Sequence, residues 1–352
     1  MSINQELPSF KVRVNCMTYN HALFIKDAMN GFCIQRTNFP FVCTIIDDAS
    51  TDGETEVINQ YLKDHFDLKD KSIVRNEENE NYLLKFARHK ENKNCYFAIL
   101  FLKYNHYSSL ENRRKKLQYI KEWDDVVKYM ANCEGDDYWI DPQKLQKQFD
   151  ILENNNKVMM VYTNYETVDE NKNIIVRPVY DKYKSYSKSG DILPILFKSN
   201  FPLTLTVMVR TEVYQSSLYK NAPASLDYLL FVSASFIGDA FYISEKTGAY
   251  RLNPNGMMHK GAVRTSSAYS LLFPYIFIEY AKGKHKKETF WNDILIKHRI
   301  MLKSLSIYLC DHDKSLIFSL LNTNKILILF LLTGCIEKII NKIIKVFNIK
   351  IL

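Results

Sequence analysis

The sequence predicts an α/β fold in which a mainly parallel sheet is flanked by helices. Two observations support this prediction. In the first half of the chain, short apolar runs alternate with longer helical patterns, which is typical of βαβ units. The run FVCTII at 41–46 is almost continuously apolar, as expected for a strand that is covered on both faces of a sheet.

Four strands are expected in the first half, each ending in a polar loop, at residues 11–17, 41–46, 72–74 and 126–133. The first is followed by TYNH and then by a helix with apolar positions at Ala22, Leu23, Ile25, Ala28 and Met29. A second helix is expected at 56–62. Residues 76–125 are interpreted as an insertion before the fourth strand, and its basic cluster NRRKK is either a solvated helix face or a contact to a substrate phosphate.

The fourth strand is followed by the sequence CEGDDYWIDP and then by another helix. Asp141 and Pro142 are expected to cap this helix and to start its first turn. Leu145, Phe149 and Leu152 recur at i, i+4 and i+7, which predicts a core-facing stripe. The acids of CEGDDYWIDP therefore lie between the carboxyl end of a strand and the start of a helix, where open α/β sheets bind ligands.

Glu134, Asp136 and Asp137 occupy three of four consecutive positions. Carboxylates this close repel one another, so either a cation offsets the repulsion or at least one pKa is raised. Hard cations such as Mg²⁺ prefer oxygen ligands of this kind. The alternative is a polar turn whose acids favour the dipole of the following helix. The position at the end of a strand and the neighbouring Tyr138 and Trp139 favour a cation site.

The loop DDASTDG at 47–53 is a second acidic segment that follows a strand. Asp48, Ser50, Asp52 and Gly53 match positions 1, 3, 5 and 6 of an EF-hand loop, but Asn59 takes the place of the final Glu. Because a strand precedes the loop, calcium binding of this type is excluded. Acids at this edge can instead accept hydrogen bonds from a base or ribose. The sequence contains neither G-x-G-x-x-G nor a P-loop motif.

The chain resembles a family 2 glycosyltransferase with the GT-A fold, of the bacterial polysaccharide and lipopolysaccharide type. The resemblance covers about residues 10–153 and is carried by Thr18-Tyr19-Asn20, IIDDASTDG at 45–53, and EGDDYWIDPQKLQKQ at 134–148. It implies an inverting, metal-dependent transfer of a sugar from a nucleotide diphosphate donor. The donor is expected to be a UDP-sugar and the metal Mn²⁺ or Mg²⁺.

The resemblance also implies roles for individual residues. The residues expected at the nucleotide are Thr18, Tyr19, Asn20, Asp47, Asp48 and Arg75, with Asp48 accepting a hydrogen bond from the base. Glu134 and Asp136 form the counterpart of the D-x-D motif, in which Asp136 is the expected metal ligand and Asp137 supports it. This chain has Glu134 where the family usually has Asp, and Glu134 is expected to contact ribose or metal.

An inverting transfer needs a base that deprotonates the acceptor hydroxyl. The resemblance places it at Asp227 in LDYLLF, with Asp239 in FIGDAF as the competing candidate. The segment 245–259 resembles the Y-R-x-H-x-x-G region of the family. Asn253 replaces its histidine, and His259 is an alternative ligand there.

The expected domains are a GT-A domain at 1–265, with a nucleotide-sugar-binding half at 1–153 and an acceptor half at 154–265, and a helical basic extension at 266–352. Residues 281–352 carry 13 Lys and Arg against 5 Asp and Glu, so this segment holds the whole net charge of +8. The apolar run at 326–336 is shorter than the roughly 20 residues of a spanning helix. Within 336–352, isoleucines and Phe347 share one helical face and Lys338, Lys342 and Lys345 the opposite one. This pattern predicts either a membrane-surface helix or packing against the catalytic domain.

The sequence therefore predicts a cytoplasmic enzyme at the inner face of the plasma membrane, with a glycan or lipid-linked glycan acceptor and no nucleic-acid partner. No leader segment is expected at the N-terminus, and seven scattered cysteines without C-x-x-C favour reduced thiols. Two alternatives stay open. One is a sugar nucleotidyltransferase, and the other is an inactive, membrane-associated assembly subunit.

Overall fold

The computed structural model describes residues 8–107, 110–197, 199–222 and 227–254, together with Gly256, Leu272, Tyr275, Ile276 and Glu279. The chain divides into two compact units. The first comprises Met1–Ile192, Phe201–Val213 and Gly238–Gly256, and the second comprises Leu193–Asn200, Tyr214–Ile237 and Met257–Leu352. The expected boundary at residue 265 and the expected tail helix at 336–352 lie outside the described residues.

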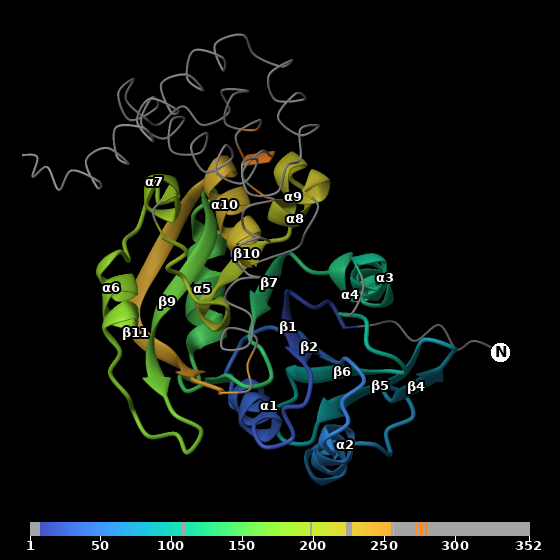
Figure 1. Ribbon diagram of the computed structural model, residues 1–352. Helices are drawn as coiled ribbons and strands as arrows, with labels where there is room; N and C mark the ends of the chain where they lie inside the picture. The colour runs from blue at the N-terminus through green and yellow to red at the C-terminus, as the bar shows by residue number, and fades with distance from the viewer. Residues whose placement is uncertain are drawn as a thin grey trace, which may run out of the picture. The chain divides into compact units, whose positions relative to one another are not determined.

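The described strands form one sheet in the first unit, in the order β3-β5-β6-β2-β1-β7-β10-β9-β11-β8, with β4 paired to β5 (Figure 1). Their bounds are β1 Val12–Thr18, β2 Phe41–Asp47, β3 Phe66–Asp67, β4 Arg75–Glu78, β5 Tyr82–His89, β6 Cys95–Leu102, β7 Tyr129–Asn132, β8 Tyr138–Trp139, β9 Val158–Val168, β10 Met208–Arg210 and β11 Asp239–Arg251. The central strands β6, β2, β1 and β7 pair in parallel, which confirms the expected fold class.

Two strand predictions were wrong. Residues 71–73 form a turn in place of the expected third strand, and β4 starts at Arg75. The supposed insertion at 76–125 contains β5 and β6, and β6 pairs directly with β2 in the centre of the sheet. Every residue of β6 is buried, so the aromatic run CYFAILFL is a strand covered on both faces, like β2.

The helices of the first unit flank the sheet (Figure 1). They are α1 Ile25–Cys33, α2 Glu54–His65, α3 Leu110–Tyr119, α4 Lys121–Asp124, α5 Lys144–Asn154 and α6 Pro178–Ser185, with the 3-10 turn η1 Thr204–Thr206. α1 and α2 lie side by side (Figure 1). Leu23 was expected on the apolar face of the first helix, but the helix starts only at Ile25 and Leu23 is 87% exposed.

α5 packs against β9 through the predicted stripe, because Leu145 and Leu152 are fully buried and Phe149 packs against the core. The expected cap was wrong, since α5 begins at Lys144. Asp141 lies before the helix, where its Oδ1 accepts a hydrogen bond from the backbone N–H of Gln143 at 2.8 Å. The carboxylate thus shapes the turn that leads into the helix.

Lys144 is fully buried at the start of α5, and burial lowers its pKa to about 7. Its Nζ donates to Gln148 Oε1 at 2.6 Å and to the carbonyl oxygen of Thr206 at 3.2 Å. Below pH 7 both the folded and the unfolded chain hold this proton, and between pH 7 and about 10.5 the unfolded chain binds more protons. We therefore expect the free energy of unfolding to rise as the pH increases through this window, by at most about 5 kcal/mol from this group.

Urea unfolding of the wild type and of Lys144→Met between pH 6 and pH 10 measures this contribution. The increase should be smaller in the variant, which has no amine to titrate, so the stability difference between the two proteins should depend on pH. Parallel curves for the two proteins would contradict the assignment.

The described helices of the second unit are α7 Leu193–Leu196, α9 Ser217–Asn221 and α10 Asp227–Ile237, while α8 Glu212–Gln215 spans the boundary between the units. Nine of the eleven residues of α10 are buried, as is typical of a helix that is apolar on all sides. Tyr228 on α10 donates its hydroxyl hydrogen to the carbonyl oxygen of Leu196 at 3.2 Å, which ties α10 to α7.

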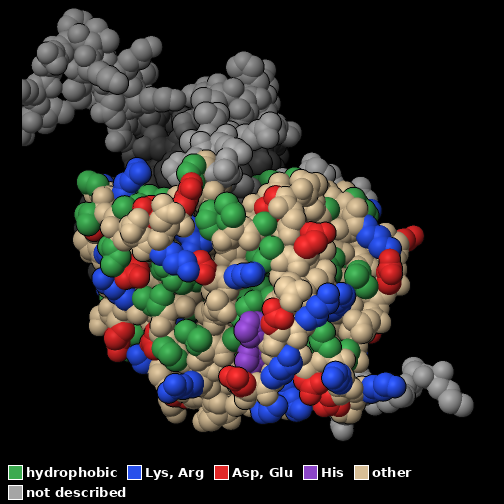
Figure 2. Space-filling view, turned by 90° about the horizontal axis from the view of Figure 1, so that it is seen from below, with side chains coloured by type: hydrophobic (Ala, Val, Ile, Leu, Met, Phe, Trp, Pro, Cys, Tyr) green, Lys and Arg blue, Asp and Glu red, His purple; other side chains and the backbone are tan. Residues whose placement is uncertain are grey.

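Charged side chains of both signs are interspersed over the face seen in Figure 2. This mixture agrees with the net charge of zero that the first 280 residues carry. Among the described residues, no helix combines the length and the apolar character needed to cross a bilayer.

Candidate functional site

The TYNH loop after β1 and the DDASTDG loop after β2 are joined through Glu54, the first residue of α2. Glu54 is fully buried and accepts hydrogen bonds from the Thr18 hydroxyl, from the backbone N–H of His21 at 2.9 Å and from the Ser50 hydroxyl at 2.8 Å. Burial is the largest influence on this carboxyl and raises its pKa, which the hydrogen bonds oppose. Glu54 therefore fixes the two loops against each other.

Asn20 adds a second link between these loops. Its backbone is left-handed, with φ of 57°, a conformation that Asn tolerates better than most residues. Its N–H donates to Ser50 Oγ at 2.9 Å, and its Oδ1 accepts from the N–H of Thr51 at 2.8 Å. Tyr19, beside it, is 46% exposed. Tyr19 and Asn20 are thus exposed next to the second loop, whereas Thr18 is buried. The contact of these three residues to a nucleotide base stays a prediction.

Asp47 and Asp48 are both buried, and their carboxylates have different partners. Asp47 accepts from the N–H of Ser50 at 2.9 Å and from the Thr55 hydroxyl at 2.6 Å, so it holds its own loop. Asp48 accepts from the backbone N–H groups of His106 at 2.7 Å and Tyr107 at 3.0 Å. Asp48 therefore fastens the segment after β6 to the end of β2, and its proposed bond to a base would use a remaining lone pair.

Gly135 lets the acidic segment lie directly against the TYNH loop. Its N–H donates to the carbonyl oxygen of Met17 at 3.0 Å. A Cβ at this position would lie 2.2 Å from Thr18 Oγ1 and 3.1 Å from His21 Nδ1, so a residue with a side chain does not fit. The glycine between the two acids is therefore required by a close approach of two loops.

Asp136 presents a partly exposed carboxylate that faces two polar side chains. Its Oδ2 accepts a hydrogen bond from Asn253 Nδ2 at 3.1 Å and lies 3.6 Å from His21 Nε2. The exposed fractions of the Asp136 and His21 side chains are 18% and 16%. Asp136 is thus accessible, and its partners come from the loops after β1 and β11.

Asp137 is buried behind Asp136, where its Oδ1 accepts from the backbone N–H of Arg251 at 2.8 Å. Burial, followed by the negative charges of Asp136 and Glu134, raises its pKa well above the usual range. The Arg251 guanidinium is held by Asp27 of α1 at 2.7 Å. These contacts place Asp137 as a support for the acidic segment, and the repulsion among the three acids is what a bound cation would reduce.

The described residues contain no group of three His, Cys, Asp or Glu side chains placed to hold a metal. Asp136 still fits a divalent cation, because Mg²⁺ and similar ions are often held by one or two carboxylates together with substrate phosphates. The carboxylate is accessible, and its negative charge contributes to the raised pKa of Asp137 beside it. A metal bound here would depend on oxygen ligands from a substrate diphosphate.

The other predicted residues belong to other elements of the fold. Arg75 forms ion pairs with Glu77 at 2.7 Å and Glu122 at 2.9 Å on the edge strand β4. Asp227 begins α10 in the second unit, and Asp239 begins β11 in the first. His259 lies outside the described residues. The roles proposed for these four residues stay predictions.

Three residues near the acids were not identified from the sequence as site residues, namely Glu54, His21 and Arg251. Glu54 has a local signal, because it directly follows the acidic loop and Gly53, whose φ is 90°. His21 belongs to the TYNH segment, but its approach to Asp136 depends on the pairing of β1 with β7. The contact from the Arg251 backbone to Asp137 joins positions 114 residues apart, which a local pattern does not reveal.

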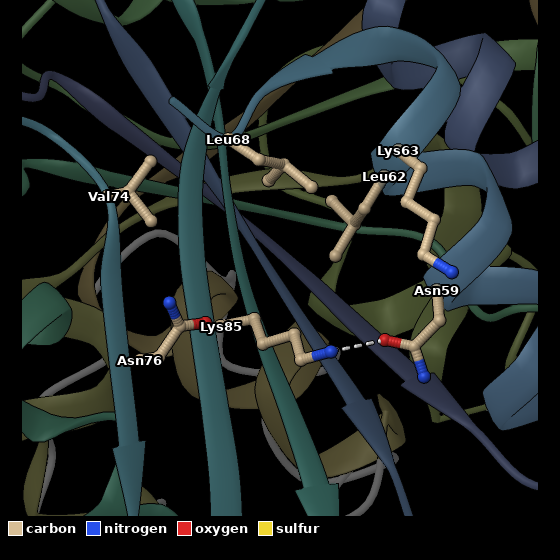
Figure 3. A pocket seen from close by; sticks show the side chains of 7 residues that line it. All are labelled: Asn59, Leu62, Lys63, Leu68, Val74, Asn76 and Lys85. Carbon is tan, nitrogen blue, oxygen red and sulfur yellow. Dashed lines mark hydrogen bonds between the residues drawn. The ribbon is translucent and has the colours of Figure 1, made fainter. Parts of the chain in front are cut away.

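A small pocket lies between α2 and the strands β4 and β5 (Figure 3). Lys85 donates from Nζ to Asn59 Oδ1 at 2.6 Å across it. Its volume of about 100 Å³ is below the roughly 300–1,000 Å³ of sites for small organic ligands. We therefore do not assign a substrate to this pocket.

Comparison with known proteins gives distant relatives and a shared fold. The chain matches no family model. It is 25% identical over 261 residues to the uncharacterized protein Rv1520 of Mycobacterium tuberculosis, covering 69% of this chain and 59% of that protein. It is 27% identical over 184 residues to the uncharacterized glycosyltransferase MJ1057 of Methanocaldococcus jannaschii, covering 52% of this chain and 59% of that protein. The chain thus spans 59% of the length of each relative.

Among solved structures, the chain is similar to residues 1–349 of S. aureus TarS in complex with UDP-GlcNAc. The TM-score is 0.53 at 14% sequence identity, and the match covers 84% of this chain and 73% of that one. A likeness at this identity concerns the fold. The fold is a mixed α/β sheet of the GT-A type with a mostly parallel centre flanked by helices.

Proposed function

We propose that this protein is an inverting glycosyltransferase that uses a nucleotide diphosphate donor, a UDP-sugar, and a divalent cation held at Asp136. The observation that carries the proposal is the accessible Asp136 carboxylate at the carboxyl ends of the parallel strands β1 and β7. In open α/β sheets, ligands bind at this edge. The MJ1057 relative, which is named a glycosyltransferase, and the TarS structure with bound UDP-GlcNAc support the same class of substrate.

Each residue of the candidate site has a proposed role. Asp136, backed by Asp137 and accompanied by Glu134, would hold the cation. When bound, the cation stabilises the negative charge of the leaving diphosphate. Glu54 and Asn20 hold the two nucleotide-side loops in a fixed arrangement, so the donor meets a site that needs little reorganisation.

The proposed acceptor is a saccharide or lipid-linked saccharide of a cell-surface polysaccharide. The basic amphipathic pattern at 336–352 supports attachment to an anionic membrane surface, at the cytoplasmic face of the membrane. Cosedimentation of the full-length chain with anionic and neutral vesicles tests this part, and equal recovery in both supernatants would argue against it.

Release of UDP or GDP from a panel of nucleotide sugars tests the proposed function. We expect the full-length chain with MnCl₂ to release UDP, and we expect EDTA to stop the release because the diphosphate loses its counter-charge. Removal of the metal followed by its restoration should recover the rate. Calorimetric titration with UDP should show the same dependence on metal.

The main alternative is an assembly subunit that keeps the fold without turnover. The residues Glu134 and Asn253 are the reason to consider this alternative, because the family usually has Asp and His at these positions. Such a subunit would release no nucleotide from any donor in the panel and would bind UDP equally with or without metal. That outcome would overturn the proposed function.

A further inference from the structure

His21 is the last residue of the TYNH loop and faces the acidic segment, and both of its ring nitrogens lie near polar atoms. Its Nδ1 is 3.2 Å from Thr18 Oγ1, and its Nε2 is 3.6 Å from Asp136 Oδ2. The backbone N–H of His21 is held by the buried Glu54. Thr18 and Glu54 thus hold the ring and the backbone of His21, and Nε2 faces the accessible carboxylate.

The hydrogen bonds of Thr18 show which role its hydroxyl takes toward His21 Nδ1. Thr18 donates its single hydroxyl hydrogen to Glu54, so its oxygen acts as the acceptor toward His21 Nδ1. A neutral imidazole with its proton on Nδ1 has a lone pair on Nε2. In that tautomer the lone pair of Nε2 and the Oδ2 atom of Asp136, which are 3.6 Å apart, are two acceptors that can both serve as ligands of a divalent cation placed between them.

We propose that His21 Nε2 is a direct ligand of the divalent cation held by Asp136. The Thr18 hydroxyl and Glu54 then form the supporting shell that fixes the tautomer and the orientation of the ring, as is usual for metal-binding histidines. Asn253 contacts the same carboxylate from another side. The inference rests on the proposed function only in that a divalent cation binds at Asp136.

A nitrogen ligand has a consequence for metal preference. Imidazole binds Mn²⁺ less strongly than it binds later transition metals. It is a still poorer ligand for Mg²⁺ and Ca²⁺, because these ions favour ligand sets made of oxygen. We therefore expect the site to bind Mn²⁺ more tightly than Mg²⁺, with His21 responsible for the difference. This preference is independent of the donor sugar and can be measured without turnover.

Electron spin echo spectroscopy of the Mn²⁺-loaded, full-length chain tests the proposal directly. The wild type should show modulation from a coordinated nitrogen, and His21→Gln should lose it. Titration with MnCl₂ and MgCl₂ in the presence of UDP should show a loss of Mn²⁺ affinity of about tenfold or more in His21→Gln and a smaller loss for Mg²⁺. His65→Gln, an exposed histidine at the end of α2, is the matched control and should behave as the wild type.

The possible results separate this inference from the proposed function. Bound Mn²⁺ without nitrogen modulation, or equal losses for both metals, would overturn the role of His21 while leaving a metal-dependent transferase. Absence of Mn²⁺ binding would overturn both. Circular dichroism of His21→Gln, compared with the wild type, separates a lost ligand from lost folding.

Discussion

Asp136→Asn is expected to abolish the metal-dependent binding of UDP. The substitution keeps the shape of the side chain and the possibility of a contact to Asn253, but it removes the negative charge that would hold the cation. Loss of a partner outside the ligand shell typically costs 10–100-fold in metal affinity, and loss of the charged ligand itself should cost at least about that much. Isothermal titration of the variant with UDP in the presence of MnCl₂ measures the effect.

Asp150→Asn provides a matched control for this prediction. Asp150 is an exposed aspartate on α5 that bonds to Gln146, so its replacement makes the same chemical change at a surface position. The control should bind UDP as the wild type does, with and without EDTA. If Asp136→Asn retains wild-type binding that EDTA removes, the cation is held elsewhere.

The sequence predicted β1, β2 and β7 from their short apolar runs, of which only that of β2 is almost continuous. These strands lie at the expected positions, and the two acidic segments follow β2 and β7 as expected. The wrong strand predictions concern segments whose local sequence pattern does not indicate their place in the sheet. β6 is as apolar as β2, yet the polar residues around it suggested an insertion. Its partner β5 has the mixed sequence YLLKFARH, which gives no clear periodicity by itself.

The site was predictable in its residue types and less so in its contacts. Three acids around a glycine, at the end of a strand, indicated a cation site before any geometry was known. The role of Glu54 was not predictable, because its three donors come from two different loops. The sequence left open whether Asn253 or His259 contributes a ligand, and the structure places the amide of Asn253 against Asp136. The long-range register of β1, β7 and β11 decides these contacts.

These contacts also bear on the replacement of Asp by Glu134. Asp136 has an accessible carboxylate with His21 and Asn253 beside it. A longer side chain two residues earlier can act on the ribose or add its charge without being the principal ligand. The departure from the usual motif is therefore compatible with a working cation site, provided that Asp136 carries most of the binding.

Asp227→Asn is expected to keep donor binding and to lower the rate of transfer by about 10²–10⁴-fold, the usual contribution of a positioned base. Asp227 is the first residue of α10, where its Oδ1 accepts from the N–H of Tyr228 at 2.6 Å. An amide can replace the carboxylate at this position without removing the residue that begins the helix, so the fold should be retained. With a donor identified by the nucleotide-release panel, steady-state kinetics should show a lower kcat, while calorimetry should show an unchanged UDP affinity.

Asp239→Asn tests the competing candidate for the base by the same change. Asp239 begins β11, and its N–H donates to the carbonyl oxygen of Lys157 at 2.8 Å, so a backbone bond holds the position independently of the carboxylate. If Asp227 is the base, this variant should transfer at the wild-type rate. If Asp239→Asn is the slow variant and Asp227→Asn transfers normally, the base is Asp239. A base must remove the proton of the acceptor hydroxyl, so the slow variant should also lose its dependence on pH in the range where the wild-type rate rises.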